Sequence, residues 1–157
     1  MKSLVAIIAV LFTFLCCSAC STKDKEPAPA QNNGLGNTKP SSTKMKITIG
    51  TSVFTATLYD NPSANAFKEM LPLSIDMTEL NNNEKYHDLP SILPTNVAVD
   101  GDMKMGDLTL YGSKTLVLFY KNFNTSYSYT KLGSFDNPTG LVTALGAGNV
   151  VVKFEKN

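Results

Sequence analysis

The stretch Met45-Lys-Ile-Thr-Ile-Gly-Thr-Ser-Val-Phe-Thr-Ala-Thr-Leu58 alternates apolar and polar residues on both sides of a glycine-led pair. Alternation of this kind is typical of strands with one buried face, and Gly50-Thr51 suits the two-residue turn that joins antiparallel strands. The stretch therefore predicts a hairpin in which Ile47 lies opposite Phe54 and Met45 opposite Ala56. The buried face is expected to carry Met45, Ile47, Ile49, Phe54, Ala56 and Leu58.

Further strands are predicted where alternation recurs, at 73–78, 106–111, 115–121 and 149–155. Two short helices are predicted to follow the tripeptide Asp-Asn-Pro, which occurs at 60–62 and again at 136–138, because asparagine caps helices and proline fits the first turn. The apolar positions of these helices are Phe67, Met70 and Leu71 before Pro72, and Leu141, Val142 and Leu145 before Gly146.

About eight strands and two helices result for the part of the chain after residue 44. So many strands in so short a chain favour closure, because a barrel has no exposed strand edges. The predicted fold class is therefore mainly β: a closed eight-stranded barrel whose two open ends are covered by the helices. Residues 45–157 are about the length that forms one hydrophobic core, so one domain is expected.

The first twenty residues contain all three cysteines of the chain. Lys2, the apolar run 4–15 and the sequence Cys17-Ser-Ala-Cys20 resemble the signal of a bacterial lipoprotein. We expect residues 1–19 to be a signal peptide and the sulfur of Cys20 to carry lipid, which leaves no pair of cysteines for a disulfide. Two alternatives stay open: an ordinary secretory signal in which Cys20 is incidental, and a signal anchor that is never cut.

Residues 20–44 are predicted to be the lipidated Cys20 followed by a flexible linker, because Leu35 is the only large apolar residue after it. The charged run 23–26 has an alternative interpretation as a sorting signal. The expected location is the cell envelope, with the domain held at a bacterial membrane through Cys20 and facing outside the cytoplasm.

The charge of the chain is nearly balanced, with 14 Lys and Arg against 13 Asp and Glu, and every one of the 14 is lysine. A nucleic-acid partner would require a clustered basic surface, so none is expected. The partners predicted are the membrane and a peptide or small-molecule ligand, for a domain that is itself monomeric.

No metal and no cofactor are expected. His87 is the only histidine, and zinc needs more nitrogen or sulfur ligands than this chain supplies. Asp100, Asp102 and Asp107 lack the spacing of a calcium loop and are better explained as turn or strand-start residues. Motifs of an activated serine or cysteine nucleophile are absent as well.

The domain resembles the compact bacterial cyclophilin-like proteins over nearly all of residues 45–157. The similar segments are 71–73 (Leu-Pro-Leu), 83–86 (Asn-Glu-Lys-Tyr), 89–90 (Leu-Pro), 106–108 (Gly-Asp-Leu), 118–120 (Leu-Phe-Tyr), 127–133 (Tyr-Ser-Tyr-Thr-Lys-Leu-Gly) and 146–154. The resemblance implies an eight-stranded barrel with two capping helices, which agrees with the strand pattern. It also implies a groove of the kind in which cyclophilins hold peptide.

The residues that make cyclophilins prolyl isomerases are missing. The family motifs Phe-His-Arg and Gln-Gly-Gly-Asp have no counterpart, and the chain contains no arginine. The segment Glu84-Lys-Tyr-His87 stands in the region of the first motif, but a lysine on a flexible stem does not reproduce the planar fork of a guanidinium group. Efficient isomerase activity is therefore not expected, and no residue is assigned a catalytic role.

The leading hypothesis is a lipid-anchored binding module that holds a peptide or small ligand without changing it, because amphipathic aromatic side chains suit a binding cleft. The groove candidates are Glu84, Lys85, Tyr86, His87, Phe119, Tyr120, Tyr127 and Tyr129. Phe119 and Tyr120 are neighbours on a strand, so one of them should face the core. The alternatives are a residual or divergent peptidyl-prolyl isomerase-type enzyme using Lys85, His87 and Glu84, and an accessory partner of redox proteins.

Overall fold

The computed structural model describes residues 40–97 and 101–157, with side chains described from residue 43 onward. The predictions made for the signal peptide, for Cys20 and for most of the linker lie outside the described residues. Asp100 lies outside them too.

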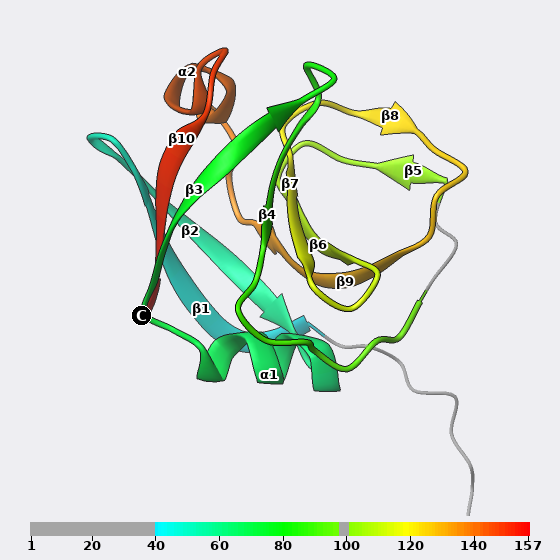
Figure 1. Cartoon of the computed structure of the whole chain (residues 1–157). Coiled ribbons are helices and arrows are strands. Elements are labelled where there is room, and N and C mark those ends of the chain that lie inside the picture. Colours follow the sequence, from blue (N-terminus) through cyan, green and yellow to red (C-terminus); the bar gives the residue numbers. More distant parts are fainter. Residues whose placement is uncertain (1–39, 98–100) are drawn as a thin grey trace, which may run out of the picture. The chain divides into compact units, whose positions relative to one another are not determined.

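Eight antiparallel strands close into a barrel in the order β1-β10-β3-β4-β7-β6-β9-β2, as predicted (Figure 1). Their bounds are β1 Pro40–Ile49, β2 Ser52–Tyr59, β3 Leu73–Leu80, β4 Glu84–Asp88, β6 Asp107–Tyr111, β7 Thr115–Phe119, β9 Tyr129–Phe135 and β10 Val150–Lys156. Two short strands, β5 Asp102–Met103 and β8 Phe123–Asn124, pair with each other outside the barrel wall.

The first hairpin has the predicted register, with Ile47 opposite Phe54 and Met45 opposite Ala56. Gly50 leads its turn with a φ of 57°, a conformation that side chains disfavour and glycine adopts readily. Strand β1 begins at Pro40 rather than at Met45, so the end of the predicted linker belongs to the barrel.

The first helix, α1 (Pro62–Glu69), starts as predicted. The Asn61 side chain accepts a hydrogen bond from the Ala64 amide at 2.8 Å and donates another to the Lys131 carbonyl at 2.9 Å, which ties the helix to β9. Phe67 is its fully buried aromatic residue and contacts the Phe154 ring edge-on. Figure 1 shows α1 across one end of the barrel and α2 at the other.

The second helix, α2 (Leu141–Leu145), starts later than predicted. Its N-cap is Gly140, because Asn137 accepts a hydrogen bond from the Thr139 amide at 3.0 Å and so forms a turn in place of a helix cap. The helix ends at Gly146 as predicted, and its residues Leu141 and Leu145 are buried in the core.

Apolar residues pack in two separate clusters on the two faces of the barrel wall. Alternation along β7 directs Leu116 and Leu118 into the barrel interior and Val117 and Phe119 to the outside. The outer cluster joins the wall to the β5–β8 pair and consists of Met103, Val117, Phe119 and Tyr129, with Tyr86 and Phe123 at its margin. This outer cluster is the floor of the candidate site.

Neither helix in the described part of the chain is long or apolar enough to span a membrane.

Candidate binding groove

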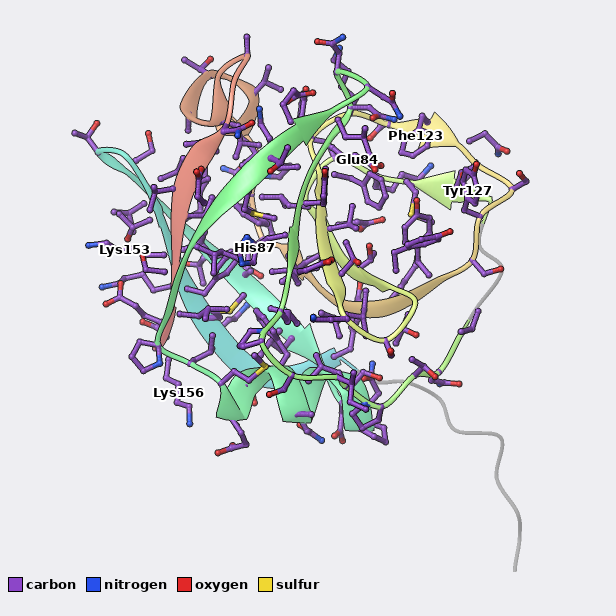
Figure 2. All side chains as sticks on the ribbon, viewed as in Figure 1. Glu84, His87, Phe123, Tyr127, Lys153 and Lys156 are labelled. Atoms are coloured by element: carbon purple, nitrogen blue, oxygen red, sulfur yellow. The ribbon has the colours of Figure 1, made fainter. Side chains whose placement is uncertain are left out.

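A groove of about 600 Å³ lies on the outer face of the barrel, beside the outer apolar cluster. It is lined by the aromatic residues Tyr86, Tyr111, Phe123, Tyr127 and Tyr129, by the polar residues Asn81, Asn83, Glu84, Thr115, Asn124, Thr125 and Ser126, and by Leu80 and Val117. Figure 2 shows Glu84, Phe123 and Tyr127 gathered on the same side of the barrel. Its size falls within the range of pockets for small molecules and side chains.

Five rings form a continuous aromatic row along the groove, in the order Tyr127, Tyr111, Tyr129, Phe119 and Phe123. The centroid distances between successive rings are 6.1, 5.6, 5.3 and 5.1 Å. Phe119 and Tyr129 are buried at its base, whereas Tyr111 and Tyr127 are 47% and 62% exposed. The row therefore offers a fixed apolar base and an accessible aromatic rim.

Strand register explains how these rings meet. Tyr111 ends β6 directly opposite Tyr129, the first residue of β9, so the two rings stand side by side on the outer face. Tyr86 on β4 lies opposite Val117 on β7 and extends the same face toward β3.

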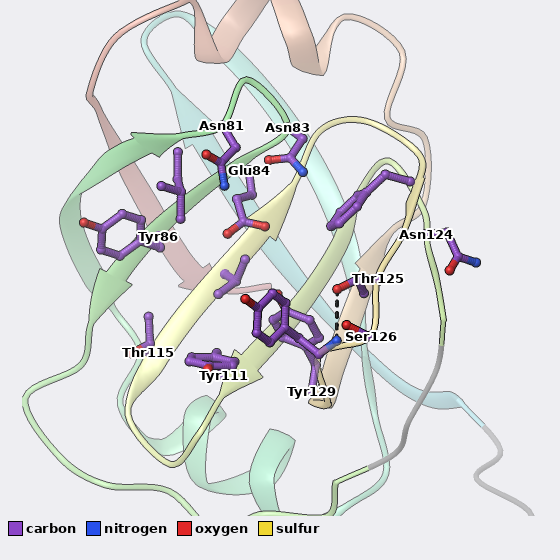
Figure 3. A pocket seen from close by; sticks show the side chains of 14 residues that line it. Asn81, Asn83, Glu84, Tyr86, Tyr111, Thr115, Asn124, Thr125, Ser126 and Tyr129 are labelled. Atoms are coloured by element: carbon purple, nitrogen blue, oxygen red, sulfur yellow. Dashed lines mark hydrogen bonds between the residues drawn. The ribbon is translucent and has the colours of Figure 1, made fainter.

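The segment that carries Phe123 and Tyr127 is held over the wall by polar contacts. Asn122 accepts a hydrogen bond from the Met105 amide at 2.7 Å, and Asn124 donates one to Asp102 at 2.9 Å. The Thr125 hydroxyl accepts the Tyr127 amide at 3.1 Å, drawn as a dashed line in Figure 3. These contacts fix the far wall of the groove.

Glu84 is the only charged residue among the described residues that line the groove. Only 8% of it is exposed, and its carboxylate forms no hydrogen bond or ion pair with any described residue. Burial, and then the negative charge of Glu79, raises the pKa of Glu84 above its ordinary value. Figure 3 shows its carboxyl group directed into the groove, between Asn83 and the rings of Tyr111 and Tyr129.

The charge of Glu84 also affects the pKa of one tyrosine in the aromatic row, Tyr129. Burial, and next the charge of Glu84, raises the pKa of Tyr129 to about 12. The Tyr129 side chain is therefore a neutral phenol at physiological pH, and its ring faces remain weakly negative.

Lys85, predicted as a groove residue, points to the opposite side of β4 and is fully buried. Its ammonium group binds the Glu79 carboxylate and the carbonyl oxygens of Gly146 and Gly148, at 3.0 and 2.7 Å. Tyr120, another candidate, also belongs to the barrel interior, where its hydroxyl donates to Glu79 at 2.8 Å. Neither residue lines the groove, because side chains alternate along a strand.

His87 does not line the groove either. Its Nδ1 lies 2.9 Å from the Asp76 carbonyl oxygen, and Figure 2 places the ring well away from Glu84 and Tyr127. The structure therefore does not bring Lys85, His87 and Glu84 together.

Four of the eight predicted groove residues line it, namely Glu84, Tyr86, Tyr127 and Tyr129, and Phe119 lies beneath them in the aromatic row. Sequence reasoning missed Tyr111, Phe123 and the polar side chains of Asn81, Asn83 and 124–126. Tyr111 was predictable in part, because it alternates with the inward residues Leu108 and Leu110 and so had to lie on the outer face.

Within residues 40–97 and 101–157 no group of three histidine, cysteine or acidic side chains is placed to hold a metal ion. The Asp107 carboxylate accepts a hydrogen bond from the Lys104 amide at 2.9 Å in the turn before β6. The Asp102 carboxylate accepts one from the Asn124 side chain. Both aspartates thus hold turns and loops.

The model of the cyclophilin-like family matches residues 47–155, which is most of the barrel domain. No match was found among curated proteins or among solved structures.

Proposed function

Because the chain belongs to the cyclophilin-like family, we propose that its domain is a binding module that holds a peptide or small ligand in the outer groove without chemical change. The module is anchored by lipid on Cys20 and faces outside the cytoplasm. The observation that carries the binding role is the aromatic row with its exposed rim, beside a concave space of about 600 Å³.

A rigid row of tyrosines supports binding for energetic reasons. Tyrosine offers a large contact area and a polar tip, and it loses little conformational entropy when a ligand immobilises it. Tyr129 and Phe119 are already held by packing, so a ligand would meet a surface formed in advance. Preformed surfaces of this kind lower the cost of association.

The chemistry of the lining supports a role without catalysis. Lys85 uses its ammonium group inside the barrel, and His87 lies outside the groove, so neither supplies a proton donor or acceptor to a bound ligand. A general acid or base must come within hydrogen-bond reach of the reacting group. Of the three residues that the isomerase-type alternative would use, only Glu84 lines the groove, so this arrangement does not support that alternative.

Anchoring is supported by the sequence alone, through the cleavage pattern that ends at Cys20. Acyl chains on that residue would hold the chain at a membrane without any contribution from the barrel. The residues between Cys20 and β1 would then separate the groove from the lipid surface.

A ligand screen tests the proposal, with tyrosine fluorescence as the readout, since four of the six tyrosines line the groove and the chain has no tryptophan. Capped peptides and small aromatic or aliphatic compounds are titrated into the full chain, and hits are repeated with the double variant Tyr111→Ala, Tyr127→Ala. We expect affinity to fall about tenfold or more, from the loss of two aromatic contacts.

The matched control is Tyr59→Ala, because Tyr59 lies on β2 and does not line the groove. Binding in the groove would be refuted by hits that bind the double variant as tightly as the unaltered chain but bind Tyr59→Ala more weakly. Conversion of a bound proline peptide or other hit into product would refute the absence of chemistry.

A further inference from the structure

Glu84 is a buried acidic residue with no partner among residues 40–97 and 101–157. Moving a carboxylate out of water is costly unless hydrogen bonds or an opposite charge replace the lost hydration. The Glu84 carboxylate has neither among the described residues, and the charge of Glu79 disfavours its ionisation further.

The neighbouring residue shows that this fold does pair buried charges where they serve stability. Lys85 is fully buried and has three oxygen partners, and its carboxylate partner Glu79 is also bonded by Tyr120 and by the Asn82 amide. The two residues are neighbours on β4, but their side chains lie on opposite faces of the strand. Lys85 points to three oxygen partners inside the barrel, whereas Glu84 points into the groove. The unpaired carboxylate is therefore a feature of the groove surface.

The surroundings of Glu84 favour a positive group. The described lining contains no lysine, and the charge of Glu84 acts on Tyr129, whose ring contacts the ring of Tyr111 in the aromatic row. Aromatic faces attract ammonium groups, and this attraction strengthens where water is excluded. An anion in the same place would meet one negative charge and no positive one.

We propose that the groove receives an alkylammonium group, whose charge pairs with the Glu84 carboxylate and whose carbon atoms pack on the rings of Tyr111 and Tyr129. This inference rests on the proposed binding function and names the chemical class of its ligand. Two sources supply such a group: a lysine side chain presented by a peptide, and a free small molecule.

Two matched pairs of probes test the proposal by calorimetric titration of the full chain in a maltoside detergent. The first pair is Nα-acetyl-lysine-methylamide and its norleucine analogue, which has a side chain of similar shape without the ammonium group. The second pair is choline and 3,3-dimethylbutan-1-ol, its uncharged carbon analogue. We expect the charged member of at least one pair to bind about tenfold or more tightly than its neutral analogue, and the pair that discriminates identifies the source.

Two variants assign the preference to named residues. In Glu84→Gln the side chain keeps its shape and loses its charge, so the preference for the charged probe should fall to the part that the aromatic faces supply, about two- to fivefold. In Tyr111→Leu the apolar area stays and the aromatic face is lost, so the preference should fall about two- to fivefold. Tyr111 is 47% exposed, so this variant is expected to fold, and a melting curve checks both.

The outcomes separate this inference from the proposed function. Equal affinity of the unaltered chain for charged and neutral probes, or a preference that Glu84→Gln leaves undiminished, would overturn the ammonium site and leave the groove as a ligand site of another chemistry. Failure of all four probes to bind also overturns it, and the broader screen then decides separately whether the groove binds ligands.

Discussion

At the scale of single residues, Glu84 and Lys85 have opposite roles although they are neighbours on β4. Lys85 is fully buried and bonded to Glu79 and two carbonyl oxygens, whereas Glu84 is buried, has no partner in the described part of the chain and is directed into the groove. We therefore expect Lys85 to stabilise the barrel and Glu84 to lower its stability, as the carboxylate of the proposed binding groove.

Replacing Glu84 by Gln should increase the stability of the ligand-free protein at pH 7. The folded state raises the pKa of Glu84 and therefore holds its proton more tightly than the unfolded chain does. Stability then falls as the pH rises through the folded-state pKa. We expect Glu84→Gln to gain up to about 1 kcal/mol of unfolding free energy at pH 7, and this gain should shrink as the pH falls toward 4.5.

Urea unfolding of the full chain at several pH values measures this gain. Glu69→Gln is the control, because the Glu69 side chain on α1 is 75% exposed and should change stability by less than about 0.5 kcal/mol. A Glu84→Gln protein that is less stable than the parent at every pH would show that the carboxylate has a structural partner.

Replacing Lys85 by Met should destabilise the barrel strongly. The change leaves the Glu79 carboxylate and the carbonyl groups of Gly146 and Gly148 without their shared donor. Breaking a buried ion pair on one side costs about 3–5 kcal/mol. Urea unfolding checks this against Lys153→Met, which alters an exposed lysine of β10. Equal stability of the two variants would contradict the structural role of Lys85.

At the scale of elements, the barrel closes through the short pairing of β2 with β9. Its register consists of Ala56 with Phe135, Thr57 with Ser134 and Leu58 with Gly133. A Cβ atom on Gly133 would lie 2.5 Å from the Thr57 carbonyl oxygen, which belongs to the backbone and cannot move aside cheaply. Glycine at this position therefore permits closure.

Gly133→Ala should separate β2 from β9 and destabilise the domain by about 2 kcal/mol or more. Gly148→Ala is the matched control, because a Cβ atom there meets nothing within 4 Å. Thermal unfolding followed by circular dichroism compares the two. If Gly133→Ala and Gly148→Ala have the same melting temperature, the pairing of β2 with β9 is looser than described.

Most of the elements could be predicted from strand patterns, because apolar and polar residues alternate along a strand that has one buried face. The first hairpin, with Ile47 opposite Phe54, and the closed barrel followed from it. The start of α2 did not, because an asparagine before a proline signals a turn as well as a helix cap, and Asn137 forms the turn.

The groove was less predictable than the barrel. Alternation separates Glu84 from Lys85, but it does not say which face of β4 is the interior, and Lys85 is an uncommon residue to find in a core. Phe123 and Asn124 form the short strand β8, and the position of this strand and of the residues after it depends on contacts with Asp102 and Gly101, distant in the sequence. Short-range patterns contain no information about such contacts.

At the scale of the whole molecule, we propose that the chain combines a barrel and its outer groove with a lipid on Cys20. The change Cys20→Ala should release the chain from the membrane fraction without affecting the barrel, because no acyl chains can then be attached. Membrane fractionation and the mass of the mature N-terminus measure this. Retention of the variant in the membrane would favour an uncut signal anchor.

The most direct test of the central claim is a nuclear magnetic resonance titration of the full chain with a ligand from the screen or with the lysine probe. If the groove is the binding site, amide signals of 81–86, Tyr111 and 123–129 should shift together, and those of β1 and β10 should not move. Shifts confined to β1 and β10, with the groove signals unchanged, would contradict the account.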